Sequence, residues 1–325
     1  MGKKIGLGML VGFALILPPC FSGTSYAFVI RIAGVMGLYM ILALGLNLVI
    51  GYVGLLDLGF MAFYALGAYT SALLAVQGWG FWSATLAAAV VAVVVRLVLG
   101  APVLRLRGDY LAIVTLGFGE IARIILNNWD SLTNGPKGLS LLSAPALKPV
   151  GFLGAILVTN ADFYYLILGF VLLAVFLSLQ LENSRVGRAW VAIREDEVAA
   201  ELMGIPVTRL KMLAFALSAA FAGVAGSIFA RWENFVTPES FTFWESAFLV
   251  SMVVLGGMGS VPGVLLGVVI VSGVPELLRN VLQDPRLVSC RYLLFGVALV
   301  AVAVFRPQGL LPSRRRTLEL EHDPS

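Results

Sequence analysis

The chain has 325 residues, of which 60% are hydrophobic and 12% are charged, and its mean hydropathy is +0.96. Soluble domains are about half apolar and about one quarter charged, so this composition excludes a soluble protein and indicates an integral membrane protein. The net charge of +4 follows from Lys and Arg gathered on one side of the membrane, and it therefore predicts no nucleic-acid partner.

Long apolar runs predict an all-α polytopic membrane protein with about ten membrane segments. A helix that crosses about 30 Å of hydrocarbon must be apolar and must satisfy its backbone hydrogen bonds internally. The predicted segments are 5–21, 29–50, 60–77, 82–104, 110–127, 162–182, 212–231, 244–256, 264–281 and 290–306. The first of them has a basic start and a small-residue end, so it is either an uncleaved helix or a signal peptide.

Two glycine-rich stretches predict short or re-entrant breaks in the helices. Gly51–Gly59 reads GYVGLLDLG and Gly256–Gly263 reads GGMGSVPG, and glycine and proline at this density interrupt a helix. Backbone groups freed by a break must meet protein or a water-filled path. We therefore predict the translocation path or its gate at these stretches, with contributions from Gly51, Gly54, Asp57, Gly59, Gly256, Gly257 and Gly259.

Few ionisable residues are predicted to lie within the membrane: Asp57, Arg96, Glu120, Arg123, Glu245 and Glu276. Charges in hydrocarbon are costly without water or a partner, so they often mark transport paths. Glu120 stands three residues before Arg123 and can pair with it, or it can line the path. Asp57 either caps a helix start or lines the path. Asn47 and Thr115 are either interhelical hydrogen bonders or path ligands.

Sites for energy conversion are missing from the sequence. It contains no G-x-x-x-x-G-K-[ST] phosphate loop, and its only histidine, His322, lies in the polar tail. Cys20 and Cys290 have no metal or redox spacing. The intramembrane charges are too few for the carboxylate chains that carry protons or sodium. We therefore predict a transporter subunit, not an enzyme, with no cofactor or metal of its own and with its energy supplied from outside.

The distribution of Lys and Arg predicts the orientation, because short cytoplasmic loops collect them. With the N-terminus inside, most basic residues fall in the cytosol, and both termini are predicted to be cytosolic. Five tryptophans then fall near the outer interface, where indole rings are favoured: Trp79, Trp82, Trp129, Trp232 and Trp244.

A stretch of mixed charge, Asn183–Lys211, lies between two predicted spans and is predicted to face the cytosol. Ser184 can cap one helix that ends at Gly204 and Pro206. The predicted apolar flank of this helix is Val186, Trp190, Ile193, Val198 and Leu202, and its remaining surface is Arg188, Arg194, Glu195, Glu197 and Glu201. Mixed acid and base suit a protein groove better than anionic lipid, so the stretch is either a docking helix or a solvated connector.

Several segments resemble one family, in a single order along the chain. EVAAELMGIPVTRLKMLAFALSAAFAGVAGSIFA, which begins at Glu197, resembles the cytoplasmic loop and following helix of ABC-importer permeases, specifically the LivM-type subunit of branched-chain amino acid importers. The resemblance extends to GLNLVIGYVGLLDLGFMAFYALGAYTSALL, RGDYLAIVTLGFGEIARIILNN, TNGPKGL, VVLGGMGSVPGVLLG and FRPQGLL. Together these segments cover most of the chain.

The resemblance implies a permease of the bacterial cytoplasmic (inner) membrane that pairs with a LivH-type subunit. It also implies two cytosolic ABC ATPase subunits, which would bind ATP and Mg, and a periplasmic substrate-binding protein. The 183–211 loop would then be the coupling helix that docks on an ATPase. Ala199, Ala200 and Gly204 match the E-A-A-x-x-x-G pattern of the importers, whereas Val198 fills the glutamate position and Glu197 is displaced by one.

The resemblance further suggests a single transmembrane domain, 1–325, built from two inverted five-segment halves. The first half is 1–160, with a long outer loop near 129–161, and the second is 161–306, with the coupling loop, followed by a cytoplasmic tail at 307–325. An odd number of spans in the first half would reverse the second.

The implied cargo is branched-chain or other hydrophobic amino acids. Similar permeases carry urea or short amides, so this cargo is an alternative within the same architecture. A different alternative is an ATPase-independent channel or facilitator, in which the 183–211 loop is only a tether. A membrane enzyme would need polar groups clustered at one depth, and the predicted spans show none.

Overall fold

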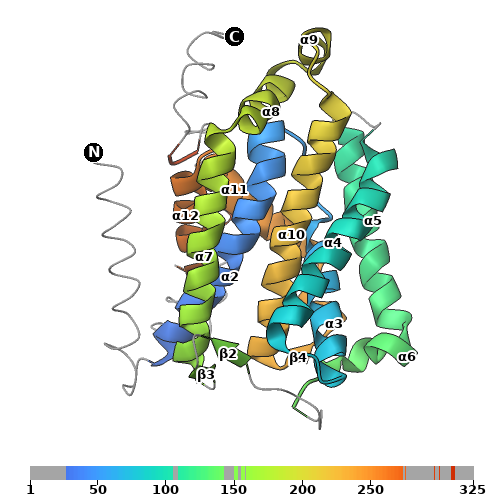
Figure 1. Ribbon diagram of the computed structural model, residues 1–325, viewed down its shortest axis with the longest axis vertical. Coiled ribbons are helices and arrows are strands. Elements are labelled where there is room, and N and C mark those ends of the chain that lie inside the picture. Colours follow the sequence, from blue (N-terminus) through green and yellow to red (C-terminus); the bar gives the residue numbers. More distant parts are fainter. Residues whose placement is uncertain are drawn as a thin grey trace.

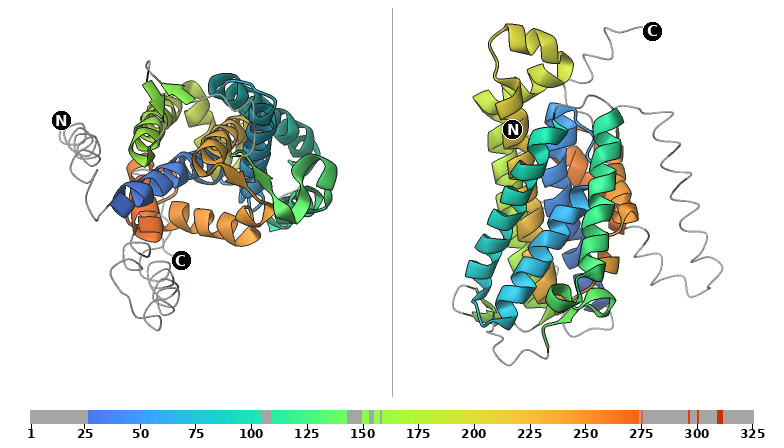
Figure 2. Two further views of the ribbon diagram at one scale, coloured as in Figure 1. Left: turned by 90° about the horizontal axis from the view of Figure 1, so that it is seen from below. Right: turned by 90° about the vertical axis from the view of Figure 1, so that its right-hand side faces the viewer.

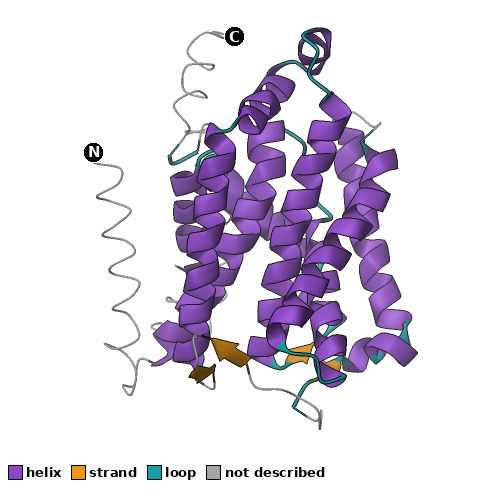
Figure 3. Cartoon of the chain, viewed as in Figure 1, coloured by secondary structure: helices purple, strands orange, loops and turns teal. Residues whose placement is uncertain are grey.

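The computed structural model describes residues 27–104, 109–142, 150–152, 155–157, 159–273, 275, 296, 300 and 309–311. The predicted segment 5–21, most of 290–306, the end of 264–281 and most of the tail lie outside the described residues, as do Cys20, Glu276, Cys290 and His322. Helices dominate the described part of the chain (Figures 1 and 3).

The elements follow one another along the chain as a series of helices with a few short strands. The helices are α2 (Ala27–Asn47), a π-helical turn (Leu48–Val53), α3 (Phe60–Val76), α4 (Phe81–Val103), α5 (Asp109–Asn128), α6 (Asp130–Thr133), α7 (Asn160–Asn183), α8 (Arg185–Glu195), α9 (Glu197–Leu202), α10 (Val207–Glu233), α11 (Phe243–Gly256), α12 (Val261–Val268) and a second π-helical turn (Val269–Gly273). The strands are β1 (Leu139–Ser140), β2 (Val150–Phe152), β3 (Ala155–Leu157) and β4 (Phe235–Val236), and 3₁₀ turns occupy Gly135–Lys137 and Pro238–Ser240.

Five of these helices are long and apolar enough to cross a membrane: Phe28–Val53, Phe81–Val103, Tyr110–Asn128, Asn160–Asn183 and Val207–Glu233. Phe60–Val76 and Val261–Gly273 are apolar but shorter. α11 has 14 residues, which gives a length of about 21 Å, less than the hydrocarbon thickness of a bilayer. The predicted segments between residues 29 and 273 all coincide with helices, whereas the count of ten and the inverted halves stay predictions.

α10 lies at the centre of the bundle, in contact with α2, α3 and α4 (Figure 2). A Cβ atom on Gly67 of α3 would lie 2.5 Å from the carbonyl oxygen of Gly223. A Cβ atom on Gly226 would lie 2.3 Å from the carbonyl oxygen of Tyr64. The backbones of α3 and α10 therefore touch, which is how small residues allow helices to associate in a membrane.

The outer helices leave large apolar side chains exposed. Leu86 and Val98 on α4, Ile113 on α5 and Phe176 on α7 are each more than half exposed. In the apolar 18-residue stretches of α4 and of α5, only 22% is buried. The corresponding shares are 72% for the stretch that includes α2 and 61% for α10. In a membrane protein such outer faces contact lipid or another subunit, so α2 and α10 form the interior.

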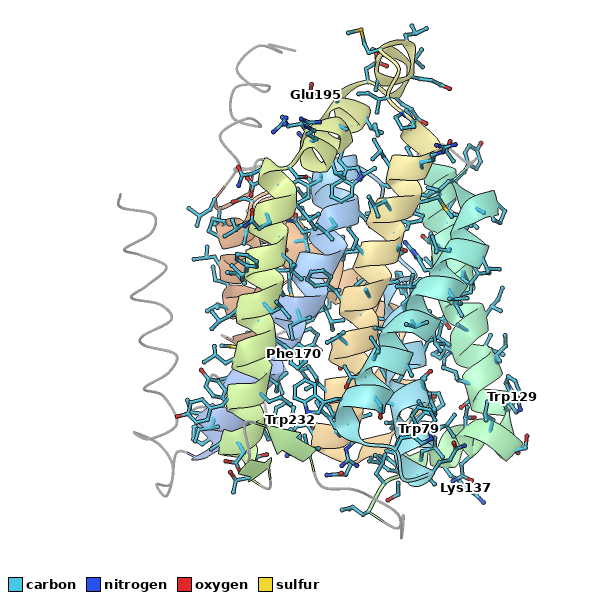
Figure 4. All side chains as sticks on the ribbon, in the orientation of Figure 1. Trp79, Trp129, Lys137, Phe170, Glu195 and Trp232 are labelled. Atoms are coloured by element: carbon cyan, nitrogen blue, oxygen red, sulfur yellow. The ribbon has the colours of Figure 1, made fainter. Side chains whose placement is uncertain are left out.

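The two ends of the bundle differ in composition. Glu195 lies at one end, with α8 and α9, and we call this the loop end; Trp79, Trp129, Trp232 and Lys137 lie at the other, which we call the tryptophan end (Figure 4). The short strands also lie at the tryptophan end (Figure 3), where β1 pairs with β4 and β2 with β3, both antiparallel. The common position of Trp79, Trp129 and Trp232 agrees with the sequence prediction that these residues share one side.

Candidate functional site

The segment between Ser184 and Gly204 folds as two short helices, α8 and α9, so the prediction of one continuous helix is wrong. Asp196 interrupts it with extended backbone angles, φ −153° and ψ 111°. Its carboxylate accepts hydrogen bonds from the backbone amides of Val198 and Ala199, at 2.8 and 2.9 Å. Aspartate is among the preferred N-cap residues, so Asp196 begins a new helix instead of continuing the old one.

Both predicted ends of this segment are confirmed. Ser184 caps α8 by accepting a hydrogen bond from the amide of Gly187, at 3.0 Å. Gly204 follows α9 with a left-handed φ of 82°, a conformation that glycine adopts without steric cost. α8 and α9 thus project together from the loop end of the bundle (Figure 1).

α8 is fixed to the bundle through its buried side. Trp190 is fully buried and donates a hydrogen bond from its indole Nε1 to the carbonyl oxygen of Leu210, at 2.8 Å. Ile193 is also buried. These two residues confirm the first part of the predicted apolar flank, and they attach α8 to the start of α10.

α9 contradicts the second part of that predicted flank. Val198 is 54% exposed, and Leu202 and Met203 are each 83% exposed. Ala200 instead faces inward and is buried, and Glu197 forms an ion pair with Lys211 of α10 at 2.6 Å. α9 is therefore held by one apolar and one charged contact and presents its larger apolar side chains outward.

The residues predicted for ATPase coupling divide into two groups. Those that are exposed at the loop end, where a soluble partner can reach them, are Arg188, Glu195, Ala199, Glu201 and Gly204. Those that contact the rest of this chain are Arg194, Glu197 and Ala200. The sequence analysis placed Arg188, Arg194, Glu195, Glu197 and Glu201 on one surface of a single helix, whereas Arg194 and Glu197 contact the rest of the chain.

Arg194 reaches from α8 to the first glycine-rich break. Its Nη1 donates a hydrogen bond to the carbonyl oxygen of Gly51, at 2.8 Å. Its side chain covers Gly54, where an added Cβ atom would lie 2.5 Å from the Cγ atom of Arg194. Gly54 also has a left-handed φ of 79° and ends the π-helical turn. The exposed loop is therefore connected directly to the end of α2.

The two glycine-rich breaks lie against each other, which the sequence did not reveal. The backbone amide of Gly259 donates a hydrogen bond to Oδ1 of Asn47, at 2.9 Å, and Asn47 is fully buried. A Cβ atom on Gly51 would lie 2.1 Å from Oδ1 of Asn47 and 2.5 Å from the amide nitrogen of Gly259. We call these residues, Asn47, Gly51, Gly259 and the Arg194 side chain, the break junction.

The second break is completed by a segment from the end of the chain. α11 ends at Gly256, and Gly257 and Gly259 take positive φ angles of 122° and 75°. The amides of Leu310 and Leu311 donate to the carbonyl oxygens of Leu255 and Gly256, at 2.9 and 3.0 Å. Leu310 and Leu311, the last two residues of the FRPQGLL motif, thus satisfy carbonyl groups at the end of α11, as a buried helix end requires.

Asp57 follows the first break and forms a buried ion pair. An Nη2 atom of Arg96 lies 2.5 Å from Oδ2 of Asp57, and the two side chains are 4% and 0% exposed. Oδ1 of Asp57 accepts a hydrogen bond from the amide of Gly59, at 3.1 Å, just before α3 begins. The guanidinium of Arg96 also lies over the rings of Phe215 and Phe63, at 3.9 and 4.5 Å from their centroids. Asp57 thus contacts the residue before α3, but Gly59 is the N-cap residue and the helix has no side-chain cap, so a role of Asp57 in the path stays a prediction.

The remaining predicted path residues make contacts between elements. The amide of Leu58 donates to Oγ1 of Thr115, at 3.2 Å, and a Cβ atom on Gly59 would lie 2.1 Å from the carbonyl oxygen of Thr115. Glu120 accepts a hydrogen bond from Nε of Arg123, at 3.0 Å, so the predicted pair is present on α5 and is about one third exposed. A role of these side chains in the path stays a prediction.

Sequence reasoning missed two long-range pairs. Asp57 and Arg96 are 39 residues apart, and Tyr39 donates a hydrogen bond to Glu245, 206 residues away, at 2.7 Å. The signal that could have found the first pair was present, because both residues belong to a short set of intramembrane charges of opposite sign. A buried charge needs a partner of opposite sign, and this set contains few possible partners for Asp57.

Comparison with known proteins identifies the family. The model of the family described as branched-chain amino acid transport system, permease component, matches residues 28–303. The chain belongs to this family. It is accordingly a membrane permease subunit and not an enzyme.

Relatives within the family share most of the chain. The high-affinity branched-chain amino acid transport system permease protein LivM of Salmonella typhimurium is 45% identical, over 98% of this chain and 77% of the relative. LivM of Escherichia coli K12 is 44% identical, over 90% and 72%. LivH of the same Escherichia coli strain is 28% identical, over 84% and 91%. No solved structure matches this chain.

Proposed function

We propose that this chain is a membrane-spanning subunit of an ATP-driven importer in the bacterial cytoplasmic (inner) membrane. The proposed cargo is branched-chain or other hydrophobic amino acids, because the LivM relatives carry that cargo in their names. The loop end is assigned to the cytosol, together with both termini, and the tryptophan end to the periplasm. The observation that carries the proposal is the continuous connection from the projecting helices α8 and α9 to the break junction, through Arg194.

The proposed partners follow from the family and from the exposed surfaces. This chain resembles both LivM and LivH of one organism, Escherichia coli K12, which supports a pair of related permease subunits. The bare apolar faces of α4, α5 and α7 offer surface for such a subunit and for lipid. Two cytosolic ABC ATPase subunits would bind ATP and Mg, and a periplasmic binding protein would deliver the cargo at the tryptophan end. This chain itself is proposed to hold no cofactor.

Coupling would run from α9 to the break junction. Val198, Leu202 and Met203 form an exposed apolar surface at the tip of the loop, which suits a cleft on an ATPase subunit. Displacement of α9 would move α8, because a single residue, Asp196, joins them. α8 would then move the end of α2, since Arg194 is bonded there. The break junction is the proposed gate.

If α9 docks on the ATPase, replacing Leu202 by Glu should weaken binding of the ATPase subunit. We expect at least a tenfold loss of the ATPase subunit that co-purifies with the permease, because a charge at the centre of an apolar contact costs about 2 kcal/mol or more. The measurement is the ratio of ATPase to permease after affinity purification from membranes. Leu142→Glu is the matched control, because Leu142 is 79% exposed at the opposite end; it is expected to leave the ratio unchanged.

The same preparation separates the importer from a channel. Reconstituted vesicles that contain the permease pair with its binding protein should take up leucine only when the ATPase subunits and ATP are present. Uptake at an equal rate without any ATPase would contradict the importer and support the channel, with α8 and α9 as a tether.

A further inference from the structure

A cavity lies toward the tryptophan end, away from the break junction. It has a volume of about 250 Å³, is partly open and lies between α2, α3, α10 and α11, and Trp232, which is at the tryptophan end in Figure 4, contributes to its wall. Pockets for drug-sized ligands measure about 300–1,000 Å³. A cavity slightly below that range suits a molecule the size of an amino acid.

Most of the wall is apolar. Leu38 and Leu42 come from α2, Met61 from α3 and Phe229 from α10. Leu42 and Met61 are buried within the bundle. A wall of this kind gains free energy from contact with an aliphatic side chain, at about 25 cal/mol for each Å² of apolar surface removed from water.

The polar groups of the cavity are few and acidic. Glu245, in the first turn of α11, accepts a hydrogen bond from the hydroxyl of Tyr39, at 2.7 Å. Glu233 is the second carboxylate, and it forms an ion pair with Arg31 at 3.0 Å. Across the described residues, no Lys or Arg forms an ion pair with Glu245. Because Arg31 offsets Glu233, the cavity keeps one negative charge.

We propose that this cavity is a binding site for the ammonium group and the aliphatic side chain of an amino acid during import. Glu245, oriented by Tyr39, binds the ammonium group by a charge-assisted hydrogen bond, and the apolar wall contacts the side chain. The proposal rests on the proposed import function and adds to it a site and a basis for selection. A neutral amide such as urea offers neither the positive charge nor the aliphatic group, so the cavity selects against it.

Replacement of Glu245 by Gln tests the charge with little change of shape. The complete importer, with its partner permease, ATPases and binding protein, is reconstituted in vesicles, and uptake of radiolabelled leucine is measured. We expect Glu245→Gln to lower uptake about tenfold or more, because a hydrogen bond to a charged group is worth about 1.5–3 kcal/mol. ATP hydrolysis stimulated by the binding protein should persist, since the loop end is unaltered.

Glu239→Gln is the matched control. Glu239 lies on the same side, in the 3₁₀ turn before α11, and is 68% exposed, but it does not line the cavity. It should transport leucine within about twofold of the unaltered protein, as exposed carboxylates contribute little. Leucine uptake by Glu245→Gln equal to that of Glu239→Gln would overturn the site while leaving the import function intact.

A thiol-labelling experiment measures the charge of the cavity without relying on transport. Cys20 and Cys290 are first replaced by serine, and Ser240, which lines the cavity, is then replaced by cysteine. A cationic methanethiosulfonate should label this cysteine several times faster than an anionic one, and Glu245→Gln should abolish the difference, because like charges repel and opposite charges attract at close range. Equal labelling rates in the presence of Glu245 would overturn the proposed charge.

Protection by ligand completes the test in the same preparation. Leucine at millimolar concentration should slow the labelling, whereas the leucine analogue with a keto oxygen in place of the amine should not. Equal protection by both compounds would overturn recognition of the ammonium group. Failure of the whole importer to take up leucine would count against the proposed cargo, while the labelling rates would still report the charge of the cavity.

Discussion

Replacing Asp57 by Asn is expected to destabilise the protein by about 3–5 kcal/mol, because the change leaves the buried charge of Arg96 without its partner. Arg96 is 4% exposed and is surrounded by the rings of Phe63 and Phe215, so water cannot take the place of the lost carboxylate. Asparagine keeps an oxygen that can accept the hydrogen bond from Gly59. The loss therefore reports the charge and not the helix start.

A double replacement should recover much of the loss. Arg96→Met alone leaves Asp57 as the uncompensated charge and should destabilise by a similar amount, whereas Asp57→Asn with Arg96→Met removes both charges. The stability of all three variants is measured as the midpoint of thermal unfolding, monitored by size-exclusion chromatography of the detergent-solubilised complex. Strictly additive losses in the double variant would show that the two residues do not act as a pair.

The pair on α5 gives a matched comparison. Glu120→Gln breaks an ion pair of the same chemistry with Arg123, but these side chains are 32% and 26% exposed. We expect a loss below about 1 kcal/mol, because solvent reaches and screens a pair that is about one third exposed. A loss as large as that of Asp57→Asn would indicate that exposure does not decide the cost, and that α5 is covered by another subunit in the assembled complex.

The helices and their interruptions were largely predictable from the sequence, because their causes are local. Apolar runs of sufficient length specify a spanning helix, and the glycines of Gly51–Gly59 and Gly256–Gly263 specify where one must end. The break at Asp196 was missed although its cause is also local. Aspartate followed by Glu197 is typical of a helix start, but the hydrophobic spacing continues across Asp196 and predicts a single helix.

The assembly of the site was not predictable, because it depends on pairing between distant residues. Asn47 and Gly259 are 212 positions apart, and Arg194 and Gly51 are 143 apart. The sequence analysis singled out each of these residues, but neither their spacing nor their composition predicts that the two glycine-rich breaks contact each other. The sequence analysis placed Arg194 on the polar surface of the loop helix, which predicts a solvent-facing side chain. The position of α8 against the π-helical turn Leu48–Val53 instead brings this side chain to the carbonyl oxygen of Gly51.

Replacing Arg194 by Ala is expected to uncouple ATP hydrolysis from transport. The change removes the hydrogen bond from α8 to the carbonyl oxygen of Gly51 and exposes the surface over Gly54, while Trp190 still holds α8 in place. The outward side chains of α9 are unaltered, so the ATPase should still dock and hydrolyse ATP. We expect leucine uptake to fall about tenfold or more, because a hydrogen bond from a charged donor contributes about 1.5–3 kcal/mol to the state that it stabilises.

The ratio of leucine imported to ATP hydrolysed, measured in reconstituted vesicles, separates this role from a simple loss of folding. Arg194→Lys keeps a positive donor and should restore part of the ratio, although lysine lacks the planar fork of arginine. Arg185→Ala is the matched control, because Arg185 is an exposed arginine at the other end of α8. Its ratio should stay within about twofold of the unaltered value, as expected for an exposed charge. If Arg194→Ala lowered hydrolysis and uptake in equal proportion, Arg194 would support docking of the ATPase. The force would then have to reach the break junction by another contact of α8, of which the hydrogen bond from Trp190 to Leu210 of α10 is the first candidate.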